Sequence, residues 1–337
     1  MPERWDRTLP ELSAATVLYH DDIGHAVREN ESSLYDQDKK YTFATLRQSL
    51  DWVGVYSDAF SATPPSYSYD QSTDTFTIIP AWAATTAKSV GDWVRPTTAN
   101  GYIYECVASS GSTDAAEPTW PTTLGDEVTD DGITWRCRGC NVIDMDEDLT
   151  SLIKVGMPVR YVGSSSGTCY GICIGISASY LAFAGCPILS NETLTALYFG
   201  PAQRVVVHRL WHDGDYDGGA GVDVACEPRL TWMQADAYLV HYKIRHGSND
   251  STGASANPFV NIEIGGNVVS CEGDGSGNPD KGVQCGGTAA WYEPAPGAIK
   301  SANYKAEWGD EVNPVVTTAG TTGDAGDLSA ELVFVLE

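Results

Sequence analysis

The residues whose spacing best fits a chemical role lie in an acidic run at positions 213–218. Asp213, Asp215 and Asp217 alternate along the chain, and Gly218 follows them. Alternate carboxylates can converge on a hard cation, and a glycine allows the sharp turn of a calcium loop. Val224 occupies the place of the bidentate glutamate that closes an EF-hand. Calcium held by the three aspartates is therefore the one cofactor that the sequence suggests, and the alternative is an acidic hairpin loop.

Other motifs give weaker signals for catalysis or metal binding. Gly163–Gly167 matches the G-x-S-x-G pattern of serine hydrolases, but we expect strands on both sides, whereas a nucleophile elbow leads into a helix. Cys137 and Cys140 form a CxxC, and a zinc ribbon needs a second tight pair nearby. Acidic residues are plentiful, but none forms a recognisable pair for glycoside hydrolysis. We therefore expect no catalytic residues.

The charge of the chain limits its partners. It carries 45 acidic and 20 basic residues, a formal net charge of −25. Such a surface repels phosphates, so we expect no nucleic-acid binding. No stretch approaches the roughly 18 apolar residues of a membrane span, and the charged start has no apolar run of a signal peptide. The nine cysteines show no framework spacing, and we expect most of them to be reduced.

The glycine, proline and aromatic content favours a mainly β chain of several domains with little helix. We expect four parts. They are an N-terminal arm and attachment region with one short helix (1–80), an inserted small β module (81–140), a small β-barrel-like domain (141–200) and a C-terminal β-sandwich or jelly roll (201–337).

Local patterns predict individual elements. Apolar residues at spacings of three and four predict a helix over Thr42–Tyr56, with a strand at Trp52–Tyr56 as the alternative. Alternation around an acidic turn predicts a hairpin over Ser66–Pro80. In Cys169–Ile176, cysteine and glycine share one face, which leaves room for the close approach of another layer.

Aromatic residues crowd the inserted module: Trp93, Tyr102, Tyr104, Trp120 and Trp135. Exposed rings can stack on sugars. The alternative is that so small a unit needs its rings as core. We expect Trp93 and Tyr104 in the core and Tyr102 and Trp120 exposed. Tyr102 and Trp120, with Trp93 as a third member, are the candidate glycan contacts.

Four segments of this module resemble known proteins. They are Val90–Val94, Asn100–Tyr104, Glu117–Pro121 and Asp131–Trp135. The pattern resembles a short module of bacteriophage virion proteins, and it is similar to chitin-binding-type carbohydrate-binding modules. The resemblance covers about 50 of the 337 residues.

The resemblance implies a non-enzymatic virion structural protein of the capsid-decoration or fibre-like type, made in the host cytoplasm. Such a protein would assemble as a homo-oligomer, and by analogy we expect a trimer. Its partners would be the major capsid or tail proteins, with the arm Met1–Lys40 ordering against neighbouring subunits. The alternative is a tail receptor-binding protein that recognises host-surface glycans through the insert or the C-terminal loops.

Overall fold

A computed structural model describes most of the chain, and every regular element in the described residues is a β-strand. The described residues are 15–20, 23–28, 52–56, 60–61, 67–145, 147–189, 192–201, 204–216, 223–225, 229–232, 234–249, 258–273, 280–285, 290–317 and 325–337. The mainly β fold class is thus confirmed. Across these ranges no helix has the length and apolar character needed to cross a bilayer.

The chain divides into two compact units, Met1–Val53 and Gly54–Glu337. In the first unit, β1 (Ala15–His20) and β2 (Ile23–Arg28) pair antiparallel, with His20 opposite Ile23 across a two-residue connection. Sequence reasoning missed the second of these strands, because the residues after His20 are mostly polar and show no clear period.

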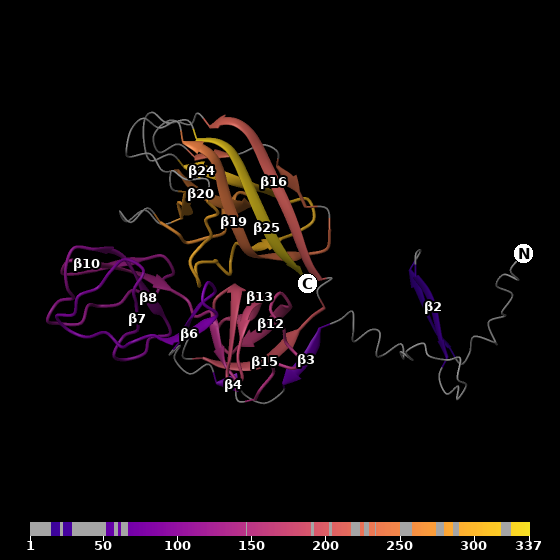
Figure 1. Cartoon of the computed structure of the whole chain (residues 1–337), viewed down its shortest axis with the longest axis horizontal. Coiled ribbons are helices and arrows are strands. Elements are labelled where there is room, and N and C mark those ends of the chain that lie inside the picture. Colours follow the sequence, from indigo (N-terminus) through magenta and orange to yellow (C-terminus); the bar gives the residue numbers. More distant parts are fainter. Residues whose placement is uncertain are drawn as a thin grey trace, which may run out of the picture. The chain divides into compact units, whose positions relative to one another are not determined.

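The second unit contains a seven-stranded antiparallel sheet, here called the central sheet (Figure 1). Its strands in spatial order are β11 (Val142–Asp144), β14 (Tyr180–Gly185), β13 (Gly167–Ile176), β12 (Pro158–Gly163), β15 (Thr193–Phe199) and β3 (Val53–Tyr56), and β4 (Phe60–Ser61) also pairs with β15. Two of these strands precede residue 80, so the sheet extends beyond the expected 141–200 segment.

The predicted helix over Thr42–Tyr56 is wrong for its last residues. Val53–Tyr56 forms β3, in agreement with the alternative, and the first ten residues of the expected helix lie outside the described residues. The stretch consists of β-favouring residue types and pairs with an available strand, β15, and such pairing overrides a helical pattern.

The cysteine and glycine face of β13 is buried, and it allows the close approach of another layer that the sequence predicted. Cys169 and Cys173 are buried, and a Cβ at Gly171 would lie 2.7 Å from the carbonyl oxygen of Ala184. At Gly175 a Cβ would lie 2.2 Å from the ring of Tyr69. That tyrosine comes from the predicted hairpin, now seen as β5 (Tyr67–Asp70) and β6 (Thr75–Ile78), so these glycines allow close packing between layers.

The inserted module, here called the insert lobe (residues 81–140), has its own four-stranded sheet. The spatial order is β7 (Trp93–Val94), β8 (Ile103–Ser109), β10 (Ile133–Arg138) and β9 (Glu127–Asp130). One face of this sheet forms a small core from Val94, Tyr104, Cys106, Ile133, Trp135 and Cys137.

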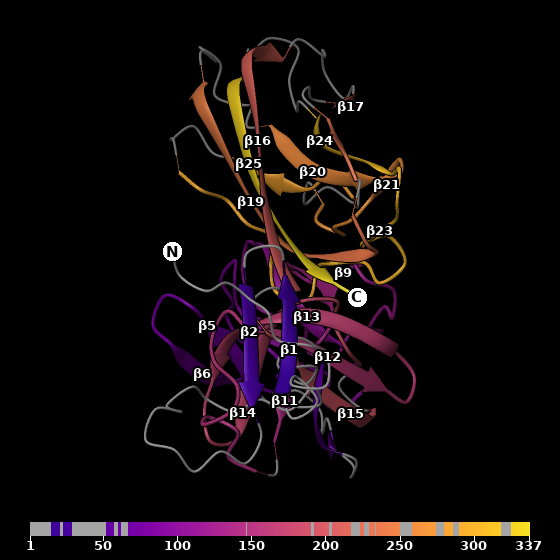
Figure 2. The same ribbon diagram turned by 90° about the vertical axis from the view of Figure 1, so that its right-hand side faces the viewer.

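The C-terminal lobe (residues 201–337) is built from two sheets, which Figure 2 shows side by side. One contains β16 (Val205–Tyr216), β25 (Ala325–Leu336), β19 (Ala237–Asn249) and β23 (Lys305–Ala306). The other contains β17 (Asp223–Ala225), β18 (Leu230–Thr231), β24 (Glu311–Thr317), β20 (Phe259–Ile264), β21 (Asn267–Val268) and β22 (Val283–Gln284). Trp232, which follows β18, packs against Phe334 of β25 with ring centroids 4.5 Å apart, so the two sheets share a core.

Candidate functional site

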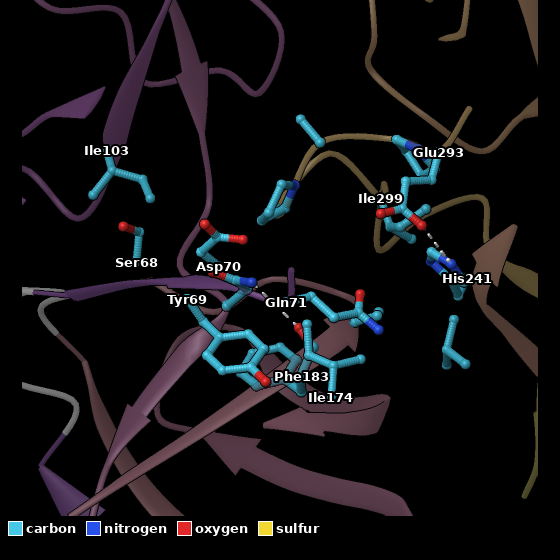
Figure 3. A pocket seen from close by; sticks show the side chains of 18 of the residues that line it. Ser68, Tyr69, Asp70, Gln71, Ile103, Ile174, Phe183, His241, Glu293 and Ile299 are labelled. Carbon is cyan, nitrogen blue, oxygen red and sulfur yellow. Dashed lines mark hydrogen bonds and ion pairs between the residues drawn. The ribbon is translucent and has the colours of Figure 1, made fainter. Parts of the chain in front are cut away.

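The candidate site is a pocket of about 470 Å³ within the second unit (Figure 3). Its lining comes from the β5–β6 hairpin, the insert lobe, the central sheet and the C-terminal lobe. Pockets of this size, at the meeting point of separate substructures, are where proteins commonly bind small molecules.

The hairpin contributes a carboxylate that is already held in place. Asp70 ends β5, and its Oδ1 accepts hydrogen bonds from the hydroxyl (2.7 Å) and the backbone N–H (2.8 Å) of Ser72. These hydrogen bonds lower the pKa of Asp70, so the exposed group is ionised at neutral pH. Figure 3 shows Asp70 on the opposite side of the pocket from the C-terminal lobe.

The C-terminal lobe contributes a second carboxylate, paired with two bases. His241 Nε2 lies 3.3 Å and Lys243 Nζ lies 3.6 Å from Oε2 of Glu293, and both bases project from β19. The hydrogen bond from His241 lowers the pKa of Glu293, and the nearby positive charges act in the same direction despite partial burial. Both pocket carboxyls are therefore ionised at neutral pH.

The remaining walls are aromatic and aliphatic. The insert lobe supplies the half-buried Trp93 and the buried Ile103, and the central sheet supplies Ile174 and Phe183. An aromatic residue in one cavity with fixed carboxylates suits a polar ligand that also has an apolar surface, such as a saccharide. The same arrangement suits glycoside hydrolysis poorly, since that reaction needs one carboxylic acid that stays protonated at working pH.

The three predicted glycan contacts do not come together. Trp93 lines the pocket, and it is half-buried rather than part of the insert core. Tyr102 and Trp120, expected to be exposed, are half-buried and pack against that core. Trp120 lies 4.3 Å from Tyr104 between ring centroids, and its indole N–H donates to Glu117 Oε1 at 2.8 Å. Tyr104 is fully buried in the core, as predicted.

The predicted calcium loop lies at the limit of the described residues. Asp213 and Asp215 belong to the backbone of β16, but their side chains and all of Asp217 lie outside the described residues. Calcium at these residues stays a prediction. Within the described ranges, no three His, Cys, Asp or Glu side chains are placed to hold a metal ion.

The G-x-S-x-G segment forms a turn, as predicted. Burial raises the pKa of the Glu192 carboxyl, but hydrogen bonds from Ser166, Ser165 and Leu189 outweigh this effect and lower the pKa. Ser165 and Ser166 are thus tied to Glu192, and β12 and β13 flank the turn. The arrangement lacks the helix that a nucleophile elbow requires.

Sequence reasoning missed a buried ionic cluster that fixes the insert lobe to the C-terminal lobe. Arg138 Nη2 lies 2.8 Å from Glu105 Oε2 and 2.6 Å from Glu272 Oε2. Arg136 Nη1 lies 3.4 Å from the same Glu272 oxygen, and its Nη2 pairs with Glu127. The side chains of Arg136 and Arg138 are 4% and 1% exposed, so the two guanidinium groups are desolvated, while their three glutamate partners keep partial access to solvent. Four insert residues and one C-terminal residue make up this cluster.

The cluster also reaches the rim of the pocket. The second oxygen of Glu272, Oε1, accepts a hydrogen bond from the backbone N–H of Ala295 at 2.7 Å, and Ala295 lines the pocket. Nearby, Gly297 has a φ of 74°, and a Cβ there would lie 2.2 Å from the carbonyl oxygen of Gly139. Two arginines alternating through the apolar strand β10 were the one signal in the sequence that such a contact existed.

Comparisons with known proteins give little further guidance. No family model matches the chain, and no curated protein matches it. A solved structure of a glycoside hydrolase 86 protein in complex with neoagarooctaose is similar over 73% of this chain, with 9% sequence identity and a TM-score of 0.21. The match spans about a third (34%) of that protein's length. At that TM-score the similarity carries no argument about fold or function.

Proposed function

We propose that the protein is a non-enzymatic structural subunit of a bacteriophage particle, of the capsid-decoration or fibre-like type. The observation that supports this best is the buried ionic cluster of Arg136, Arg138, Glu105, Glu127 and Glu272. It makes the insert lobe a fixed part of the body rather than a module on a flexible tether. A fixed, all-β body suits a part whose role is to hold a position on an assembly.

Two further features favour this proposal over an enzyme. The insert lobe carries the segments that resemble virion modules, and most of its aromatic rings form its own core. The pocket carboxylates Asp70 and Glu293 both have lowered pKa values, so neither is suited to act as a general acid at neutral pH. In the proposed assembly, residues 1–40 order against neighbouring subunits or against the major capsid or tail proteins.

The proposal is tested by the mass of the assembly and by its place on the particle. Sedimentation of the full chain should give three times the monomer mass of 36.1 kDa. A variant without residues 1–40 should lose affinity for purified capsids or tails while its second unit stays folded by circular dichroism. Negative-stain images of particles labelled at the C-terminus should show the label at repeated positions. A chain that stays monomeric and is absent from purified particles would refute the proposal.

A second candidate function, recognition of a host-surface glycan, is favoured by the junction pocket. There Trp93 lies with the fixed carboxylates Asp70 and Glu293 in one cavity, a combination found in saccharide sites. The probe is a panel of neutral and acidic oligosaccharides titrated into the full chain. Trp93→Ala should weaken binding about tenfold or more. Trp308→Ala, which removes an exposed ring outside the pocket lining, is the matched control.

The outcomes of the glycan test are distinct from those of the assembly test. Absence of binding across the panel, or equal loss in both variants, would remove the pocket as a glycan site. Neither result would affect the assembly proposal, which depends on oligomer mass and position on the particle.

A further inference from the structure

Two cysteine thiols touch inside the central sheet. The thiol of Cys186, which follows β14, donates to Sγ of Cys169 in β13, with the two sulfur atoms 3.3 Å apart. Both residues are buried, at 0% and 1% exposure. Among the described cysteines, this is the one pair whose sulfur atoms are hydrogen-bonded to each other.

The backbone holds the two residues in this arrangement. The N–H of Cys186 donates to the carbonyl oxygen of Tyr170 at 3.2 Å, and the hydroxyl of Tyr161 donates to the carbonyl oxygen of Cys186. Gly185 has a φ of 137°, and a Cβ there would lie 2.5 Å from the Tyr170 oxygen. Only glycine permits this close approach of the chain to β13, and the approach brings Cys186 beside Cys169.

Closure to a disulfide needs little movement. The sulfur atoms must approach from 3.3 Å to about 2.05 Å, which small rotations of the two side chains can provide. A bond there would link β13 to the segment after β14 across a loop of 17 positions (186 − 169). Tyr170, which follows Cys169, stacks on Tyr238 of the C-terminal lobe at 3.9 Å between ring centroids. The link would therefore lie directly beside a contact between the central sheet and the C-terminal lobe.

We infer that Cys169 and Cys186 are a site of intramolecular disulfide formation, and that the oxidant is a low-molecular-weight disulfide of the glutathione class. In the first step the Cys169 thiolate attacks the small disulfide, which forms a mixed disulfide and releases one small thiolate. In the second step the Cys186 thiolate attacks the Cys169 sulfur and releases the other. Two protein thiols are oxidised, one small disulfide is reduced to two thiols, and the two protons pass to those products.

The environment makes this bond slow to form in the folded chain. The hydrogen bond to Cys169 and burial together raise the pKa of Cys186 well above its ordinary value, so little thiolate is present at neutral pH. Exchange therefore proceeds while the chain folds or when the sheet opens locally. Once formed, the disulfide is buried, so reducing agents also reach it only when the sheet opens locally. The inference is independent of the proposed function, because it rests on the two sulfur atoms alone.

The test uses the full chain, unfolded under reducing conditions and refolded in a buffer of reduced and oxidised glutathione, with free thiols then blocked by N-ethylmaleimide. Trypsin leaves Cys169, Cys173 and Cys186 on one peptide, because no lysine or arginine lies between Arg160 and Arg204. Chymotryptic cleavage after Tyr170, Tyr180 and Phe183 places each cysteine on its own peptide. Mass spectrometry without reduction then identifies the linked pair.

We expect one linked pair, Cys169 to Cys186, and a melting temperature about 5 °C higher than that of the same sample after reduction. Cys186→Ala should abolish both results. Cys173→Ala, at an equally buried position of the same strand whose thiol donates to the Gly175 carbonyl, should leave both unchanged. If Cys186→Ala does not fold, the wild-type peptide map still decides. A map with no linked pair, or with any pair other than Cys169 and Cys186, would overturn the inference.

Discussion

Removal of one arginine from the buried cluster gives the sharpest test of how the insert lobe is held. In Arg138→Met the side chain keeps most of its volume but loses the guanidinium that pairs with Glu105 and Glu272. The cluster then contains the carboxylates of Glu105, Glu127 and Glu272 but only one guanidinium group, that of Arg136. Breaking a buried ion pair from one side costs about 3–5 kcal/mol, because the partner charges stay desolvated. The side chains of Glu105 and Glu272 are 19% and 11% exposed, so partial solvation favours the lower end, about 3 kcal/mol.

The assay is urea unfolding of the full chain, followed by tryptophan fluorescence and by hydrogen exchange in peptides of the insert lobe. With a slope of about 2 kcal/mol per molar urea, a loss of ~3 kcal/mol moves the midpoint down by about 1.5 M. Arg209→Met is the matched control. Its ion pair with Glu331 is exposed on the arginine side (79%), so the loss should be at most about 1 kcal/mol. The reasoning is refuted if the two variants lose the same stability.

Three further predictions follow from other contacts. Asp130→Ala should lower the free energy of unfolding by about 2–4 kcal/mol, because it leaves the buried indole N–H groups of Trp82 and Trp135 without their acceptor. Thermal or urea unfolding measures this loss, and an unchanged midpoint would contradict the prediction. Gly297→Ala should lower the free energy of unfolding by about 2–4 kcal/mol, because alanine is strained at this positive φ and its Cβ would collide with Gly139. The control Gly266→Ala also has a positive φ but meets no neighbouring atom, so it should lose only about 1 kcal/mol. Equal losses in the two variants would exclude the collision. The lowered pKa of Glu192 contributes stability that is present above about pH 4.5 and lost as the pH falls through the folded-state pKa. In acid titrations monitored by circular dichroism, Glu192→Gln should therefore show a shallower loss than the wild type, and identical curves would refute this.

The sequence predicts those features that depend on neighbouring residues. The alternating faces of Cys169–Ile176 predict β13 and the close approach of another layer to its cysteine and glycine face, because the period of a strand is visible in these eight residues. The hairpin Ser66–Pro80 is visible for the same reason. Predictions fail where a distant partner decides, as at Val53–Tyr56, whose strand depends on β15.

The strand β24 shows how a local rule can mislead. Pro314 lies in its middle, and proline argues against an interior strand because it lacks an N–H donor. On one side β24 pairs continuously with β20, but on the other side its partner changes from β18, opposite Glu311 and Val312, to β17, opposite Val315 to Thr317. Pro314 falls at this change of partner, which provides a place where a missing donor is tolerated.

The candidate site was beyond sequence reasoning for a related reason. Trp93 and Glu293 are far apart in the chain, and only the packing of separate lobes places both in one pocket. Likewise Arg138 and Glu272 are separated by 134 positions. Composition shows that the charges exist, but it does not show which of them are buried together.

The buried arginines have a consequence for any attempt to study the insert lobe alone. Excision of residues 81–140 would remove Glu272 and uncover Arg136 and Arg138, whose side chains are 4% and 1% exposed in the whole chain. The fragment would then expose two guanidinium groups that are buried in the whole chain and that keep only Glu127 and Glu105 as partners. Exposed guanidinium groups form bidentate contacts with sulfates and carboxylates, so the fragment would offer acidic sugars a contact that the intact protein does not offer. Affinity measured on the fragment would thus describe the cut surface, and the intact chain is the only valid reagent for asking whether this lobe recognises a glycan.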